Sequence, residues 1–212
     1  PLPMPVWALS AISLVQGALF LALSVWAGVA LAPKVGLYAP AFEAFANSSP
    51  VAVTVRPQLA PGMLGGLASG LLLVVLSYAP PPELAAAAKA FSFPLVARVL
   101  YGGITEELLL RWGLMSIVLW VLWRFLHRSH TLPPASLVWV AIVITAVLFG
   151  VGHLPAASSI VGSLTFHVVA FVIVGNAIFG VLAGWLFWRF GLESAMLAHC
   201  IAHLVAYIAA AV

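Results

Sequence analysis

The chain has no aspartate, only two lysines and a single cysteine, Cys200, among its 212 residues. Charged residues make up 6% of the sequence, whereas they make up about a quarter of a soluble domain. One cysteine excludes an intrachain disulfide. The eight Lys and Arg residues are scattered and form no basic run, so we expect no nucleic-acid partner.

Hydrophobic residues instead make up 65% of the chain, which predicts an integral membrane protein with the lipid bilayer as its surroundings. A membrane-crossing helix needs about 20 apolar residues, so the length allows about six to seven spans. We predict an all-α fold, a polytopic transmembrane helical bundle with short interfacial or re-entrant pieces. The abundance of Ala, Leu, Val and Gly favours a GC-rich bacterial source and hence the bacterial inner (plasma) membrane.

Six apolar segments are long enough to be assigned as spans. They are residues 6–31, 62–78, 93–123, 135–153, 166–187 and 194–211. Between them we expect a loop with a short interfacial helix at 41–46, a surface helix at 83–90, a turn or buried re-entrant piece at 156–163, and an interruption of the fifth span at Gly175-Asn176. We predict a single transmembrane domain, 1–212, in which peripheral spans in residues 1–92 precede a motif-bearing catalytic core of about residues 93–212.

The basic residues predict the orientation of the bundle. With six spans, five of them fall on one side of the membrane, namely Lys34, Arg56, Arg124, Arg128 and Arg189. The other side has mainly Lys89 and Arg98. Because cytoplasmic loops are enriched in Lys and Arg, we predict that the first side is cytoplasmic.

Two of the five acidic residues, Glu106 and Glu107, are adjacent within the predicted third span. A charged side chain at the bilayer centre costs about 2.5–3.5 kcal/mol on insertion scales, so such residues are usually paired or functional. Glu107 and Arg111 are four residues apart and share a helix face, which predicts an ion pair. Glu106 points about 100° away around the helix, so we predict that its carboxylate is available for chemistry.

Three histidines lie in later spans at positions that favour a shared site. Glu106 lies 17 residues before Trp123, and His153 lies 18 residues after the start of the next predicted span. At about 1.5 Å per residue, both side chains are about 26 Å from the loop that joins these antiparallel spans. We therefore expect the acid and the imidazole at the same depth. His199 and His203 are four apart on one face of the last span, and we expect that face to be turned to protein or water.

These residues resemble the ordered motifs of the CAAX-protease and bacteriocin-processing (CPBP, or Abi) family of intramembrane proteases, which includes the Ras-converting prenyl endopeptidase. The similar residues lie between about Leu100 and Leu204, in the patterns Glu106-Glu107-x-x-x-Arg111, Phe149-x-x-x-His153, and His199 on the last span. The resemblance implies an endopeptidase that acts on a membrane-embedded or lipidated peptide or protein.

The resemblance also implies the roles of the motif residues. Glu106 and His153 would activate the attacking water, and His199 would stabilise the oxyanion with His203. Glu107 and Arg111 would support the site. His203 is a departure, since the family usually has asparagine there.

The same residues also suit other functions. His199-x-x-x-His203 is a spacing that suits a metal ligand pair. The cofactor is therefore either none, with a glutamate–histidine mechanism favoured, or zinc held by His153, His199 and His203 with Glu106. Intramembrane acids and histidines also occur in proton- or metal-ion-handling transporters, although no inverted repeat is visible here. Paired histidines on spans can also ligate haem in a helical bundle, and a catalytically inactive scaffold of the same family would share the fold.

Overall fold

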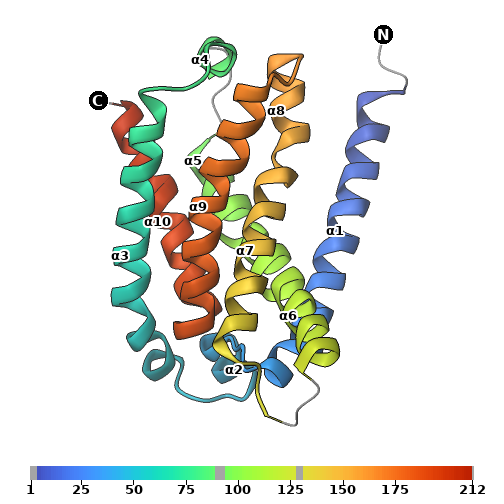
Figure 1. Cartoon of the computed structure of the whole chain (residues 1–212), viewed down its shortest axis with the longest axis vertical. Helices are drawn as coiled ribbons and strands as arrows, with labels where there is room; N and C mark the ends of the chain where they lie inside the picture. Colours follow the sequence, from blue (N-terminus) through green and yellow to red (C-terminus); the bar gives the residue numbers. More distant parts are fainter. Residues whose placement is uncertain (1–3, 89–93, 128–130, 212) are drawn as a thin grey trace.

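The computed structural model describes residues 4–88, 94–127 and 131–211. Helices make up most of these residues, and none of them lies in a β-strand, so the predicted all-α fold is confirmed. Among them, six helical segments are long and apolar enough to cross a membrane. They run up and down the long axis of the molecule (Figure 1), which gives the predicted polytopic bundle.

The helices follow one another with short connections. The first half of the chain forms α1 (Val6–Leu31), the 3₁₀ turn η1 (Ala32–Val35), α2 (Pro40–Ala46), α3 (Val51–Ser77) and α4 (Pro82–Ala88). The third span comprises α5 (Leu95–Ala97), the π-helical segments η2 (Arg98–Glu106) and η3 (Leu108–Met115), α6 (Ser116–Leu122) and the π-helical η4 (Trp123–His127). The last four helices are α7 (Ala135–Gly152), α8 (Leu154–Val161), α9 (Phe166–Phe190) and α10 (Leu192–Ala211).

Glycines bring α3 into close contact with α10. A Cβ atom added at Gly66 would lie 2.6 Å from Cβ of Ile201, and one at Gly70 would lie 2.5 Å from Cβ of Val205. Small residues permit this close packing of membrane helices, which otherwise lack a hydrophobic driving force between them. The helix α10, which contains His199 and His203, thus packs against α3 and also against α9.

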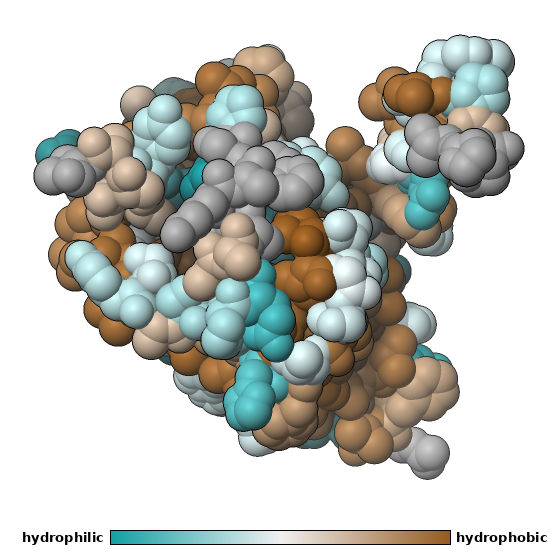
Figure 2. All heavy atoms as spheres, turned by 90° about the horizontal axis from the view of Figure 1, so that it is seen from above, coloured by the Kyte–Doolittle hydropathy of each residue, from teal (hydrophilic) through white to brown (hydrophobic). Residues whose placement is uncertain are grey.

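The helices α7 and α9 also pack closely, again at glycines. A Cβ at Gly150 would lie 2.6 Å from the backbone oxygen of Ile173, and one at Gly180 would lie 2.9 Å from Cα of Ala146. The first helix, α1, packs on the bundle along only part of its length. Its second half packs on η3, where Gly28 faces Trp112, while its N-terminal half stands apart from the bundle (Figures 1 and 2).

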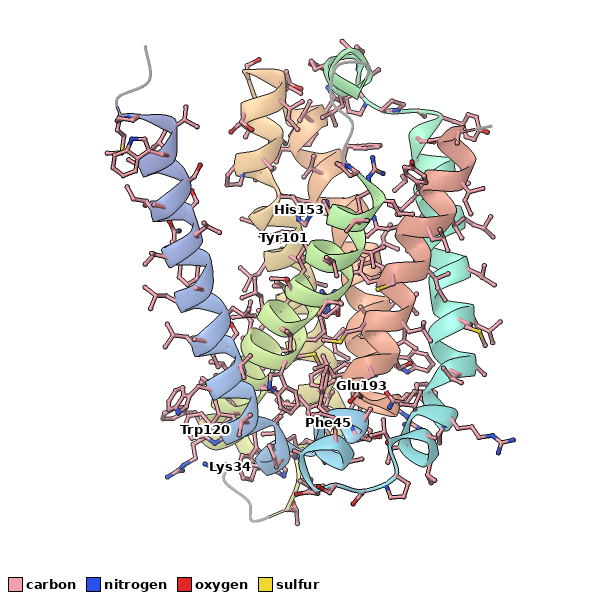
Figure 3. All side chains as sticks on the ribbon, turned by 180° about the vertical axis from the view of Figure 1, so that it is seen from behind. Lys34, Phe45, Tyr101, Trp120, His153 and Glu193 are labelled. Atoms are coloured by element: carbon pink, nitrogen blue, oxygen red, sulfur yellow. The ribbon has the colours of Figure 1, made fainter. Side chains whose placement is uncertain are left out.

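The two ends of the bundle differ in charge. Lys34 lies at one end (Figure 3), where α3 begins near Arg56, η4 contains Arg124, and α9 ends after Arg189. The third span, with Arg98 near its start, begins in the half of the bundle toward the other end (Figure 1). Apart from Arg111, which is buried within the bundle, the described basic residues are divided between the two halves as predicted; Lys89 and Arg128 lie outside the described residues, and the cytoplasmic side stays a prediction.

The second and the fifth span each differ from the sequence predictions in one feature. The second span begins at Val51, not at Gly62, and Pro57 and Pro61 lie inside α3. Proline removes a helical hydrogen bond, but neighbouring helices and side chains compensate for this in membrane helices. The fifth span is not interrupted at Gly175-Asn176, because the Asn176 side-chain amide donates to the Val172 carbonyl (2.8 Å) and α9 continues through both residues.

The segment after the fourth span also differs. The expected turn or buried re-entrant piece at 156–163 is mostly the regular helix α8, in which Ala157 is the one buried residue. A helix satisfies its own backbone, so it does not need to be buried in protein. The expected surface helix at 83–90 is observed over Pro82–Ala88, and its last two residues lie outside the described range.

Candidate active site

The third span contributes the acidic pair from a helix with unusual turns. Its segments η2 and η3 are π-helical and meet at Glu107. Such wider turns are rare and frequently occur at functional sites. Gly102 and Gly103 face α10, where a Cβ at Gly102 would lie 2.5 Å from Nε2 of His203 and one at Gly103 would collide with Sγ of Cys200. The lack of two side chains thus lets the third span lie directly against the histidines of α10.

Glu107 is fully buried and has two partners. Nη1 of Arg111 donates to its Oε1 over 3.1 Å, which confirms the predicted ion pair. Nδ1 of His199 lies 2.7 Å from the same oxygen. An ionised carboxylate only accepts hydrogen bonds, so the His199 ring carries a proton on Nδ1 and directs Nε2 away from Glu107.

Arg111 is held on all sides within the bundle. Its Nη2 donates to the backbone oxygen of Gly180 over 3.3 Å. The guanidinium carbon lies 4.8 Å from the ring centroid of Phe149 and 5.5 Å from that of Phe179. These cation–π contacts and hydrogen bonds compensate for the burial of the charge. Arg111 therefore fixes Glu107, and through it the orientation of His199.

Glu106 has a different environment, between two imidazoles. Its Oε1 lies 3.9 Å from Nε2 of His153, and its Oε2 lies 3.9 Å from Nε2 of His199. Both distances are too long for a direct hydrogen bond, but one water molecule can bridge groups at this separation. The predicted proximity of this acid to histidines of two later spans is confirmed.

His153 lies at the end of α7, near Tyr101 of the third span (Figure 3). Its Nδ1 is 2.8 Å from the Phe149 carbonyl oxygen, and a carbonyl can only accept, so Nδ1 carries the proton. In the neutral ring Nε2 is then an acceptor. The edge of Phe149 packs against this ring with centroids 4.7 Å apart. Nε2 of His153 therefore faces Glu106 as a potential base.

His203 lies one turn after His199 and stacks on it, with ring centroids 4.8 Å apart and an angle of 23° between the planes. Stacked rings turn their faces, not their nitrogens, toward one another. The described residues include no group of three His, Cys, Asp or Glu side chains arranged to hold a metal ion. Glu106, His153, His199 and His203, the residues named for zinc, do not form such a group among the described residues, and the proposed steps use no metal ion.

A cavity of about 540 Å³ opens at these four residues. Besides them, it is lined by Leu73 of α3, by Ala97, Arg98, Tyr101 and Gly102 of the third span, and by Phe149, Gly175, Asn176, Phe179 and Ala202. A second hollow of about 130 Å³, between the third span and α7, also reaches Glu106 and His153. The carboxylate is accessible from both, so a bound molecule and water can approach it by different routes.

Sequence reasoning missed two features of this site. The contact between Glu107 and His199 was not predicted, because it joins residues 92 positions apart whose helix faces cannot be aligned from the sequence alone. Leu73 was assigned to a peripheral span, yet it lines the cavity. The glycines of α3 were the available signal, since they indicate a helix packed closely on a neighbour.

Comparison with protein families assigns the chain to one of them. Residues 88–205, more than half of the sequence, match the family described as type II CAAX prenyl endopeptidase Rce1-like. The chain belongs to this Rce1-like family. The matched region includes Glu106, His153, His199 and His203. The match confirms the family resemblance that was drawn from the motifs. Comparisons with curated proteins and with solved structures gave no match.

The Rce1-like family and the six apolar helices together define the protein at a coarse level. It has the fold of a CAAX-type intramembrane endopeptidase, it is an integral membrane protein, and the family implies a bilayer environment and a peptide substrate. Figure 2, which looks onto the end of the bundle near α4 and α8, shows hydrophilic residues interspersed with hydrophobic ones on this end.

Proposed function

We propose that the chain is an intramembrane endopeptidase that hydrolyses a peptide bond of a membrane-associated protein or lipidated peptide, without a metal. The observation that supports this most is the position of the Glu106 carboxylate, with one oxygen 3.9 Å from Nε2 of His153 and the other 3.9 Å from Nε2 of His199. An acid flanked by two imidazoles in a cavity has the components of general acid–base hydrolysis.

In the proposed mechanism, Glu106 and His153 activate the water. A water molecule between Oε1 of Glu106 and Nε2 of His153 can donate a hydrogen bond to each of them. As its oxygen attacks the carbonyl carbon of the substrate, Glu106 takes its proton, and His153 orients the water. The hydrogen bond from Nδ1 of His153 to the Phe149 carbonyl supports this role, because it leaves Nε2 as the acceptor.

His199 and His203 are proposed to stabilise the tetrahedral oxyanion, which is usually the largest contribution to catalysis. For His199 to donate through Nε2, its ring must be protonated on both nitrogens. The buried Glu107 carboxylate, 2.7 Å from Nδ1, stabilises that doubly protonated form. His203 replaces the asparagine of the family and can donate from a ring nitrogen. Collapse of the intermediate breaks the C–N bond, and Glu106 returns its proton to the leaving amine.

The family and the bundle support a proposal for the substrate and for the location of the protein. The cavity is lined mainly by apolar side chains, among them Leu73, Phe149 and Phe179, which suits a lipidated or membrane-embedded peptide. We propose a CAAX-type sequence as the first substrate to examine, and the bacterial inner membrane as the location. We also propose that residues 93–212 form the catalytic core of a single domain.

Mass spectrometry of peptides released from membranes tests the proposal. Membranes containing the wild-type protein should release defined peptides that are missing from membranes containing Glu106→Gln. The matched control is Glu43→Gln, the same chemical change at an exposed residue of α2, at the opposite end of the bundle, and it should release the same peptides as wild type. Equal release by wild type and Glu106→Gln would support an inactive scaffold instead.

A further inference from the structure

The smaller hollow beside Glu106, of about 130 Å³, has no assigned role in the hydrolysis described above. Four residues line both this hollow and the larger cavity, namely Tyr101, Glu106, Phe149 and His153. These shared residues form the boundary between the two spaces. The proposed catalytic acid can therefore be reached from two sides, and the two sides need not serve the same molecule.

The proposed catalytic groups are distributed unequally between the two spaces. Among the described residues, the proposed oxyanion donors His199 and His203 line only the larger cavity, whereas Glu106 and His153 line both spaces. The carbonyl under attack must lie beside the oxyanion donors, which places the substrate in the larger cavity. The hollow is then the space at Glu106 and His153 that a bound substrate leaves open.

The hollow has the room and the polar groups that hold water. A buried water molecule needs about 10–15 Å³ of space and about two to four polar partners. The Glu106 carboxylate, the His153 imidazole and the Tyr101 hydroxyl are such partners. A phenolic hydroxyl both donates and accepts hydrogen bonds, so Tyr101 can bind a water molecule in either sense. The lining leucines, Leu109, Leu110 and Leu148, leave the water no competing polar partner on their side.

The π-helical turns of the third span explain why Tyr101 shares a side with Glu106. In an α-helix, residues five apart point about 140° away from each other. The segment η2 is π-helical, and there the backbone hydrogen bonds join residues five apart. The Thr105 hydroxyl also donates to the Leu100 carbonyl, five residues earlier, over 3.1 Å. Tyr101, five residues before Glu106, is thereby brought to the wall of the same hollow.

The hollow lies close to one surface of the membrane. The fourth span begins at Ala135, and Gly152, which lines the hollow, is the last residue of α7. At about 1.5 Å per residue it lies about 26 Å along the helix, in a hydrocarbon core about 30 Å thick. Tyrosine is enriched at this level, where its ring lies in apolar surroundings and its hydroxyl reaches water. Tyr101 and His153 lie in the half of the bundle that contains α8 (Figures 1 and 3).

We propose that this hollow is a water-binding site from which the attacking water reaches Glu106 and His153, with the Tyr101 hydroxyl as a further partner of that water. The proposal rests on the proposed endopeptidase function and adds to it the side from which water enters. The chemical step is unchanged: the water oxygen forms the bond to the carbonyl carbon, and Glu106 takes the proton. A substrate that fills the larger cavity does not block this supply.

Two glycine substitutions fill the two spaces separately. Gly152 lines only the hollow, and a Cβ there would meet no atom within 4 Å, so Gly152→Leu should fill the hollow without a collision of its Cβ. Gly175 lines only the larger cavity, and a Cβ there would lie 3.4 Å from Cδ1 of Leu76, so Gly175→Leu should narrow that cavity. The matched control is Gly17→Leu in α1, where a Cβ also meets no atom within 4 Å and neither space is lined.

Kinetics are measured on the full-length protein in lipid nanodiscs with a farnesylated CAAX peptide that carries a fluorophore–quencher pair. Gly152→Leu should lower kcat by about 10- to 100-fold and change KM less than about twofold, because it displaces the water and not the substrate. Gly175→Leu should mainly raise KM. Tyr101→Phe should lower kcat by about 2- to 10-fold, the effect of one lost hydrogen bond, and Gly17→Leu should change neither constant.

The ratio of the two constants decides the proposal. A wild-type kcat in Gly152→Leu, or a loss that lies entirely in KM, would overturn the water site while leaving the endopeptidase function intact. A wild-type kcat in Tyr101→Phe would remove Tyr101 from it.

Thiol labelling tests the hydration of the hollow without any cleavage. In a Cys200→Ser background, which removes the natural cysteine, a cysteine is introduced by Gly152→Cys or, as the control, by Val151→Cys. Val151 is the preceding residue of α7, is 41% exposed and lines neither space. Because the thiolate is the reactive form, a charged methanethiosulfonate should modify Gly152→Cys at least about 10-fold faster than Val151→Cys.

The labelling result separates the two proposals. If the wild-type protein does not cleave the peptide, the proposed function fails for this substrate, and faster modification of Gly152→Cys would still support a hydrated hollow. Equal rates at the two positions, or modification of neither, would overturn the water site whether or not the peptide is cleaved.

Discussion

Removal of the Glu107 side chain should both destabilise the protein and impair the proposed site. The carboxylate is fully buried and is bonded to Arg111 and to His199. In Glu107→Ala the Arg111 guanidinium, which is itself only 3% exposed, keeps its charge but loses its counter-ion. Removing one partner of a buried ion pair typically costs about 3–5 kcal/mol.

This free energy corresponds to a measurable shift in thermal unfolding. For a chain of about 200 residues, 1 kcal/mol changes Tm by about 2–4 °C, so Glu107→Ala should lower Tm in detergent by about 6–20 °C. The control Glu43→Ala removes a carboxylate that is exposed and accepts one hydrogen bond, from the backbone nitrogen of Ala39. It should cost about 1 kcal/mol.

The isosteric variant Glu107→Gln separates orientation from stability. Its amide keeps the shape and one acceptor oxygen, so it should unfold closer to wild type than Glu107→Ala does. It cannot stabilise the doubly protonated His199 ring, and loss of such an orienting carboxylate lowers catalysis by up to about 10⁴-fold in a serine protease. We expect a loss of about 10²- to 10⁴-fold, measured well below Tm. A Tm of Glu107→Ala within 2 °C of wild type, or a fully active Glu107→Gln, would refute this reasoning.

Three further substitutions test the packing around the site. Gly102→Ala places a Cβ 2.5 Å from Nε2 of His203, so it should displace that ring and lower peptide release with little change in Tm. Gly66→Ala places a Cβ 2.6 Å from Cβ of Ile201 and 2.8 Å from a backbone oxygen of α10, which should cost about 1–3 kcal/mol; its control Gly17→Ala meets no atom within 4 Å and should leave Tm unchanged or raised. Glu193→Ala removes the acceptor for the backbone nitrogens of Ala41 and Phe42 and should lower Tm, whereas an unchanged Tm would show that this link between α2 and α10 is dispensable.

Much of the fold could be predicted because a bilayer restricts the structures that can cross it to helices and closed barrels. Hydropathy and length defined six spans, and the first agrees with α1 at both ends, Val6 and Leu31. The start of α3 was wrong because Pro57 and Pro61 were interpreted as loop residues, whereas proline is tolerated within membrane helices. The interruption expected at Gly175-Asn176 was wrong because the asparagine bonds back to its own helix.

The site was predictable where helix geometry alone decided it. Equal distances from a shared loop were sufficient to bring Glu106 and His153 together, and a spacing of four predicted the Glu107–Arg111 pair. The position of His199 could not be derived in this way, because it depends on how α10 packs against the third span. That packing follows from Gly102 and Gly103, whose significance appears only when the facing residues are known.

The central claim is that Glu106 activates a water molecule that cleaves a peptide bond. Its most direct test is cleavage in water enriched in oxygen-18, with wild-type and Glu106→Gln membranes compared by mass spectrometry. The account predicts that wild type releases products in which one new carboxyl group contains a single heavy oxygen, and that Glu106→Gln releases none. Labelled products in equal amounts from both proteins would contradict it.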